Sequence, residues 1–325
     1  MRSMRMNRLV VLIAVFLLVA AFSVFPEGER ETGRIVLATG GTGGVYYPLG
    51  GAMASLWSDE IEGVEASSES TGASVENVNL VNELESELGL VQNDISYYAA
   101  HAEEMFEDEE PMENLRGVFT MYPETIQIIA RADADVDTVG DISDLRVAVG
   151  APGSGTEVNA RQILQMHDIT YDDIREDFLS FSEAADAIRD GNVDVAFVTA
   201  GLPTSSVMDL ATSTDITMVG IESDMLDSIL DEWSYFAEVT IPADTYSGQD
   251  SDVSAVAVMA MMIAHESLDE ELVYNITKQT LENTDVLADT HDRGREVAVE
   301  TALDGMSLDL HPGARRYFEE QDMID

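Results

Sequence analysis

The sequence predicts an α/β fold in two lobes, each a mainly parallel sheet flanked by helices, with hinge strands between the lobes. A unit of apolar strand, small-residue or polar loop and amphipathic helix recurs along the chain. Two longer β-rich segments flank a central block, and the C-terminal third has helical periodicity. Strands that alternate with helices are typical of βαβ units and mainly parallel sheets.

The chain begins with a segment that resembles an export signal. Arg2, Arg5 and Arg8 precede an apolar run from Leu9 to Phe25, and small residues suited to a signal-peptidase site follow Val19. The run is short for a spanning helix, which favours a signal peptide; an N-terminal anchor is the alternative. We therefore expect residues 1–25 to direct the protein to the periplasm or another extracytoplasmic space.

The strand–loop–helix units follow in order. Each pairs an apolar run with a loop rich in Gly, Ser, Thr or Asn and then a helical pattern; they cover residues 34–61, 88–106, 145–169 and 193–211. A further helix is expected at 180–191, with Ser180 or Ser182 as N-cap and Gly191 just beyond its end. In parallel sheets, ligands lie beyond the carboxyl ends of the strands, where the four loops are expected.

The β-rich segments 114–136 and 251–265 suggest that the chain crosses to a second lobe and later returns. We expect the first lobe at residues 26–120 and 242–325, and the second at 121–241. C-terminal helices are expected at 269–291, 294–305 and 312–321.

Two glycine-rich loops are the strongest functional motifs. The spacing of Gly40 to Gly44 fits neither a dinucleotide-binding fingerprint nor a P-loop. What remains is a set of backbone N–H groups at a helix N-terminus, which suits a carboxylate; a purely structural turn is the alternative. Residues 150–157 repeat the design, with Ser154 and Thr156 as further hydroxyl donors. Two such loops in different lobes predict a small polar ligand held from both sides.

Composition excludes several classes of protein. There are 16 basic against 63 acidic residues, a net charge of −47, which argues against nucleic-acid binding. An acidic surface adapted to concentrated salt is the favoured reading, and an unusually acidic mesophilic protein is the alternative. The chain has no cysteine, which excludes disulfides and thiolate catalysis. Its histidines lack metal-ligand spacing and no nucleophile–base pair is visible, so we predict no metal, no cofactor and no catalytic residue.

The sequence resembles a known family of transport proteins in several ordered stretches. They are ATGGTGGVYYPLGG, LGLVQNDISYYA, VGAPGSGTEVNARQIL, LSFSEAADAIRDGNVDVAFVTAGLPT, VAVMAMMI and ALDGMSLDLHPGARRYF. Together they resemble the TAXI substrate-binding proteins of tripartite ATP-independent periplasmic (TRAP) transporters. The resemblance implies a type II-like periplasmic-binding-protein fold that closes on glutamate, glutamine or a related small carboxylate. It also implies delivery of the ligand to a TRAP permease.

The resemblance places the ligand pocket on loops of both lobes. The residues expected in it are Thr39, Gly40, Gly41, Thr42, Gly43, Gly44, Tyr46, Tyr47, Thr71, Gly72, Ala73, Ser74, Gln92, Asn93, Asp94, Pro152, Gly153, Ser154, Gly155, Thr156, Thr199, Ala200, Gly201, Leu202 and Pro203. Arg131 and Arg161 are candidates for a carboxylate clamp. We expect a monomeric, non-catalytic protein. A sensory receptor or a hydrolase of small carboxylates on the same fold are the alternatives.

Overall fold

The computed structural model describes residues 33–324, and the expected signal segment lies outside them. Within this part, every strand belongs to one mixed sheet with the order β2-β1-β3-β10-β4-β7-β5-β6, to which β8 and β9 add pairs with β4 and β10. The strands are β1 Gly33–Ala38, β2 Val64–Glu69, β3 Leu88–Gln92, β4 Leu115–Arg131, β5 Arg146–Ala148, β6 Arg175–Asp177, β7 Val195–Ala200, β8 Ile216–Val219, β9 Ala237–Ile241 and β10 Val253–His265. The expected α/β fold is confirmed.

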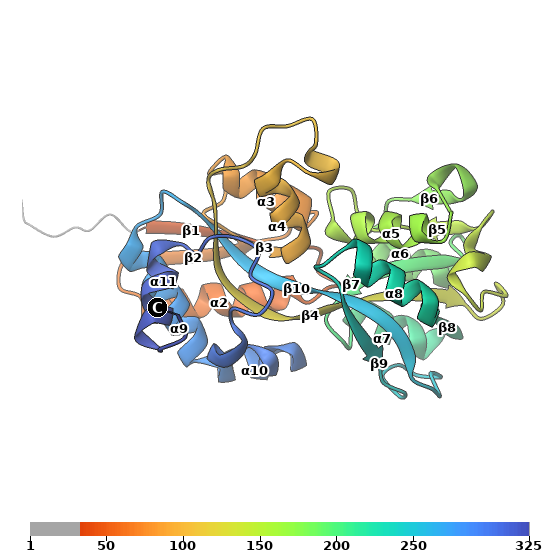
Figure 1. Ribbon diagram of the computed structural model, residues 1–325. Helices are drawn as coiled ribbons and strands as arrows, with labels where there is room; N and C mark the ends of the chain where they lie inside the picture. Colours follow the sequence, from red (N-terminus) through yellow and green to blue (C-terminus); the bar gives the residue numbers. More distant parts are fainter. Residues whose placement is uncertain (1–32, 325) are drawn as a thin grey trace, which may run out of the picture. The chain divides into compact units, whose positions relative to one another are not determined.

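Helices flank the sheet on both sides (Figure 1). They are α2 Tyr46–Glu60, α3 Ser74–Asn82, α4 Asn93–His101, α5 Gly155–Met166, α6 Phe181–Arg189, α7 Ser205–Ser213, α8 Ser223–Glu232, α9 Glu270–Glu282, α10 Thr284–Thr290 and α11 Pro312–Glu320. In the part of the chain that the structure covers, no helix has the length and apolar character needed to span a membrane.

Two long antiparallel strands, β4 and β10, connect the two lobes. In β4, Phe119 and Tyr122 pack into one core with β1, α2 and α9, whereas Ile126 and Ile128 pack into another with β5 and α5. In β10 the same change of core occurs between Val258 and Ala260. We call the part built on β1–β3, α2–α4 and α9–α11 the first lobe, and the part built on β5–β9 and α5–α8 the second lobe.

Parallel pairing is confined to the ends of the sheet. β1 pairs with β3, and β5 with β6 and β7, all in parallel. β3, β4 and β7 meet their central neighbours antiparallel. The sheet is therefore mixed rather than mainly parallel, because the two connecting strands run through its middle.

Local sequence patterns correctly predicted some helices and failed to predict others. Ser180 is the N-cap of α6, its Oγ accepting from the N–H of Glu183, and Gly191 follows that helix at φ +73°, as predicted. The helix expected at 294–305 is wrong. That stretch forms short 3-10 turns, because Gly294 lies against the backbone of α10, where any Cβ would overlap the Leu287 carbonyl. The sequence reading also missed α3 and α8.

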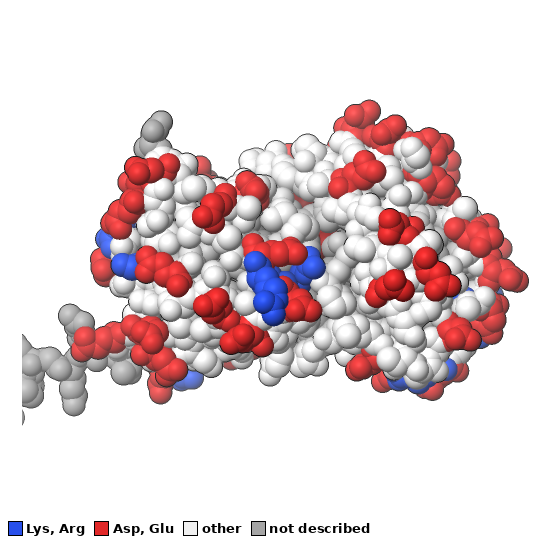
Figure 2. Space-filling view, turned by 90° about the horizontal axis from the view of Figure 1, so that it is seen from below, with Lys and Arg blue, Asp and Glu red and all other residues white. Residues whose placement is uncertain are grey.

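Acidic side chains are spread over the surface. Figure 2 shows one face, on which Asp and Glu are scattered widely while Lys and Arg gather mainly near the middle. The acidic excess therefore lies on the outside of the fold, where solvent ions can screen it.

Candidate functional site

Loops from both lobes enclose one cavity of about 70 Å³. They follow the carboxyl ends of β1, β3, β5 and β7, together with the segment before α3. Among the residues predicted for the ligand pocket, those that line it are Gly40, Gly41, Gly43, Gly44, Tyr46, Thr71, Gly72, Ala73, Ser74, Gln92, Ser154, Gly155, Thr156, Thr199 and Ala200. The structure thus brings together residues more than a hundred positions apart, at the strand edge where α/β folds bind ligands.

The first glycine-rich loop lies against the start of α6 in the other lobe. A Cβ on Gly43 would overlap the Ser182 hydroxyl, and one on Gly44 would lie 3.3 Å from the Phe181 ring. The loop also forms a tight turn, in which the N–H of Gly44 donates to the carbonyl of Gly41 at 3.2 Å. Glycine is required here for the close approach of the two lobes.

The second glycine-rich loop is held by its own hydrogen bonds. The Ser154 hydroxyl donates to the carbonyl of Ala151 at 2.7 Å and accepts from the N–H of Glu157, which makes it the N-cap of α5. The expectation that the Ser154 hydroxyl is a free donor to a ligand is therefore wrong, because its proton is already donated to the carbonyl of Ala151. Across the lobes, a Cβ on Gly155 would overlap the Gln92 side chain.

Several predicted pocket residues do not line the cavity. These are Thr39, Thr42, Tyr47, Asn93, Asp94, Pro152, Gly153, Gly201, Leu202 and Pro203. Thr42 is exposed, and Tyr47 is on the solvent side of α2 with 39% of its surface exposed. Because α2 turns 100° per residue, Tyr46 and Tyr47 cannot both face the cavity.

The other residues on this list hold the loops in place. Thr39 donates to the carbonyl of Glu69 at 2.6 Å, and Asn93 bonds the backbone of Met259 and Gly305 at 3.0 Å each. The carbonyl of Gly153, beside Pro152, accepts the N–H groups that begin α3, at 3.1 Å.

Asp94 and the segment after β7 likewise contact other parts of the protein and do not line the cavity. Asp94 accepts from Asn159 of α5 at 2.9 Å. Gly201 lies so close to Arg293 that a Cβ would overlap it, and Leu202 belongs to an apolar core next to Pro203. These groups support the cavity without reaching it.

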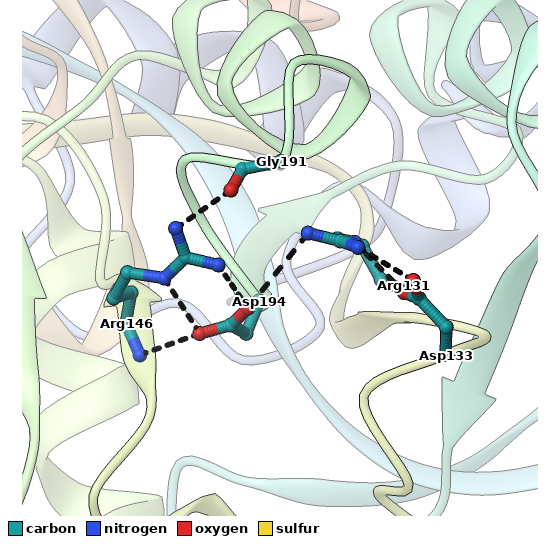
Figure 3. A network of polar contacts seen from close by, with 5 residues as sticks. All are labelled: Arg131, Asp133, Arg146, Gly191 and Asp194. Carbon is teal, nitrogen blue, oxygen red and sulfur yellow. Dashed lines mark hydrogen bonds and ion pairs between the residues drawn. The ribbon is translucent and has the colours of Figure 1, made fainter.

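Neither candidate arginine reaches the cavity, so the proposed clamp is wrong for both. Arg131 pairs with Asp133 at 2.6 Å and approaches Asp194, which also binds Arg146 (Figure 3). Arg161 is flanked by Glu104 at 3.8 Å and Glu157 at 3.5 Å. In a chain this acidic, most arginines find carboxylate partners on the surface.

The sequence reading missed part of the cavity wall. The additional lining residues are Val45, Glu124, Ala151, Ser180 and Phe181. Glu124 is the most informative of them: it is 3% exposed and its Oε2 accepts from the Tyr46 hydroxyl at 2.6 Å. The signal that could have found it is its position as a lone acid in a long apolar β-rich stretch.

Glu124 and Tyr46 dominate the electrostatics of the cavity, because they are its only ionisable lining residues in the described part of the chain. Burial raises the pKa of Glu124 to about 8; the Tyr46 hydrogen bond lowers it and the charge of Asp94 raises it. Burial, followed by the Glu124 charge, also holds the pKa of Tyr46 well above its ordinary value. Two further polar atoms of the wall, Gln92 Oε1 and Thr199 Oγ1, are buried without a hydrogen-bond partner.

The polar groups of the cavity wall are hydroxyl, amide and carboxyl groups. Among the described residues, the wall contains Ser and Thr hydroxyls and the Glu124 carboxyl group, but no His or Lys. Across residues 33–324, no group of three or more His, Asp or Glu residues is arranged to hold a metal ion. The arrangement can enclose a small polar molecule and offer it hydrogen bonds.

Comparisons with known proteins agree with this architecture. PhnD1 from Prochlorococcus marinus in complex with methylphosphonate has a TM-score of 0.57 at 9% identity, over 90% of this chain and 99% of that one. The alkanesulfonate-binding protein SsuA from Xanthomonas axonopodis pv. citri, bound to MOPS, has a TM-score of 0.50 at 14% identity, over 89% of this chain and 84% of that one. The ligand-binding component of an ABC-type import system from Staphylococcus aureus has a TM-score of 0.50 at 8% identity, over 90% of this chain and 92% of that one.

Such identities show a shared fold, that of the periplasmic binding proteins. The family comparison is more specific, because the family model described as the NMT1-like family matches residues 37–321, which is nearly all of the chain that the structure describes. By that match, this α/β chain with its cavity between two glycine-rich loops belongs to the NMT1-like family.

Proposed function

We propose that this chain is an extracytoplasmic solute-binding protein that captures one small solute in the cavity and delivers it to a membrane permease. The observation that carries the proposal is the cavity itself: both lobes contribute to its wall, and buried Gln92 Oε1 and Thr199 Oγ1 have no protein partner there. Buried polar groups are normally hydrogen-bonded, so unpartnered ones in a cavity wall favour a bound molecule as the missing partner.

The proposed ligand has a small acidic group, and a carboxylate is our first choice. The first turns of α2 and α5 begin at the cavity wall, where Tyr46, Gly155 and Thr156 line it, and the dipole at a helix N-terminus favours negative charge there. The similar proteins named above bind a sulfonate-containing buffer and methylphosphonate, so these anions are rivals to a carboxylate. A cavity of about 70 Å³ restricts all three to small molecules.

Two kinds of permease are candidates. The sequence resemblance to TAXI proteins favours a TRAP permease, which would use an ion gradient. The similarity to the Staphylococcus aureus component favours an ABC-type importer, which would use ATP. Uptake of radiolabelled ligand into vesicles that contain the permease, energised by either source, distinguishes them.

The function is tested by a thermal-shift screen in molar salt, followed by calorimetry. Small amino acids, dicarboxylates, sulfonates and phosphonates form the screen. We expect at least one to raise the melting temperature with one site per chain, and to be recovered unchanged. Conversion of the ligand would instead indicate an enzyme.

A matched pair of glycine variants locates the site. Gly43→Val should weaken binding strongly, because its Cβ would overlap the hydroxyl of Ser182 in α6 of the other lobe and would push the two loops apart. Gly51→Ala is the control: its Cβ meets only Ser68 Oγ at 3.8 Å, an ordinary contact, and alanine favours the helix. Full binding by Gly43→Val would place the site elsewhere.

A further inference from the structure

Glu124 is a buried carboxyl group that has no cationic partner among residues 33–324. It lies in β4, is 3% exposed, and forms one side-chain hydrogen bond, with the Tyr46 hydroxyl. No Lys or Arg is among the described residues that line the cavity. Buried carboxylates are normally paired with a cation, since an isolated charge in an apolar interior is costly.

The groups around Glu124 do not supply the missing charge. Tyr46 faces it from α2, Asp94 contributes a like charge from α4, and Tyr122 is near it on β4. Arg293 influences Tyr122 but is paired with Glu296 at 2.6 Å. The raised pKa of Glu124, about 8, is the expected response of a buried carboxyl group among neutral and acidic neighbours.

A second acceptor lies in the same wall. Gln92 is 3% exposed, and its Oε1 has no hydrogen-bond partner. Gln92 ends β3 and Glu124 lies in β4, so the two acceptors reach the cavity from different strands of the sheet. Two buried acceptors in one wall, one of them without a partner, match a ligand group that carries several N–H donors.

We propose that Glu124 is a specificity-determining residue, which selects solutes bearing an ammonium group and gives up a proton to solvent when such a solute binds. The inference rests on the proposed function. In the free protein, Glu124 is a neutral carboxylic acid at neutral pH. On binding, its O–H bond breaks, the proton leaves to solvent, and the carboxylate accepts hydrogen bonds from the cationic nitrogen. The acidic end of the same solute would face the first-turn N–H groups of α2 and α5.

If Glu124 instead contacted the anionic end of the ligand, the pH dependence of the affinity would have the opposite sign. If the neutral Glu124 carboxyl group donated to an anionic oxygen, binding would need the proton and would weaken as pH rises. Under our proposal protons compete with the ligand, so affinity rises with pH until Glu124 is ionised in the free protein. The sign of the pH dependence therefore separates the two.

Calorimetry on the full mature chain tests this with paired probes: L-glutamate against glutarate, L-alanine against propionate, and methylphosphonate as a nitrogen-free anion. We expect the amino member of at least one pair to bind at least tenfold more tightly than its nitrogen-free partner. Its affinity should rise about tenfold from pH 6 to pH 7, because the pKa of Glu124 is about 8. Titration in two buffers of different ionisation enthalpy should show release of about one proton per ligand at pH 7.

Glu124→Gln should lower the affinity at least tenfold and remove the proton release, while Tyr46→Phe should keep the proton release. The wild-type proton count needs no variant, so the test survives if Glu124→Gln misfolds. Nitrogen-free probes that bind as tightly as their amino partners, or affinity that falls with pH, would overturn the inference. If such binding were abolished by Gly43→Val, the proposed function would still stand. Failure of every probe to bind would overturn the inference, and failure of the whole thermal-shift screen as well would overturn the proposed function.

Discussion

Asn159 Nδ2 donates to Asp94 Oδ2 at 2.9 Å, and this hydrogen bond joins α5 of the second lobe to α4 of the first. Both side chains are buried, Asp94 at 1% and Asn159 at 0% exposure. Gln162, one helical turn further along α5, donates to the Tyr98 hydroxyl at 3.1 Å. The two helices therefore hold the lobes together beside the cavity through polar contacts.

Asn159→Ala should destabilise the ligand-free protein by about 1–3 kcal/mol, because it leaves the buried Oδ2 of Asp94 without its donor. Ligand affinity should fall as well, since the contact joins the two lobes. Urea denaturation at pH 7 measures the first effect and calorimetry the second. Asn275→Ala is the control: its amide bonds only Glu271 of the same helix at 2.8 Å, so both quantities should stay close to wild type.

The stability of the ligand-free protein should fall as pH rises from about 4.5 to 8. Burial raises the pKa of Glu124 from 4.5 to about 8 and that of Asp94 from 3.8 to about 6. Groups with a raised folded pKa favour folding below their unfolded pKa, and this contribution is lost as pH rises through the folded value. A tenfold difference in acid dissociation constant between the folded and unfolded states corresponds to about 1.4 kcal/mol of stability.

Denaturation of wild type and Glu124→Gln across this pH range checks the sign. The variant should lose much of the pH dependence and be the more stable of the two above pH 8. Glu183→Gln is a control that should leave the pH dependence in this range unchanged, because hydrogen bonds from Ser180 hold the pKa of Glu183 below its ordinary value, and its contribution changes only at lower pH. The lowered pKa values of His291 and His311 contribute with the opposite sign in both proteins, so the test is the difference between wild type and variant. A stability of wild type relative to Glu124→Gln that is flat or rises between pH 5 and 8 would contradict the assignment of Glu124 as a buried, unpaired acid.

Removing the Ser154 hydroxyl and removing the Thr199 hydroxyl should have different effects on folding stability and on ligand binding. Ser154→Ala should cost about 1 kcal/mol of folding stability through loss of the α5 N-cap. Thr199→Val should leave the ligand-free stability unchanged or slightly raised, because the Thr199 hydroxyl has no partner there. Only Thr199→Val should weaken ligand binding more than it affects folding. Melting curves with and without ligand compare the two.

Salt should stabilise the folded chain. With a net charge of −47, repulsion among surface carboxylates opposes the compact state when screening is weak. The melting temperature followed by circular dichroism should rise from low to molar salt, with sodium, potassium and a large organic cation giving similar curves if screening is the cause. A melting temperature that stays flat would reject adaptation to concentrated salt.

Local sequence signals located much of the site. A glycine cluster after an apolar strand can be recognised from a few neighbouring residues. The same holds for the Ser180 N-cap, which has Glu183 three positions later. The role of the Ser154 hydroxyl was not readable, because whether it meets a ligand or caps its own helix depends on loop geometry. Arg131 failed as a clamp because its close partner is Asp133, two positions later, and because the fold also brings Asp194, just before β7, within 4.0 Å of it.

The sequence by itself determined the alternation of strands and helices, the acidic surface and the two glycine-rich loops, since each depends on neighbouring residues or on composition. Only the tertiary structure decided that β4 and β10 make the sheet mixed, and that Glu124 faces the cavity beside Tyr46, 78 positions earlier in the chain. Strand order and side-chain burial depend on contacts between distant segments, which hydrophobic periodicity along the chain does not encode.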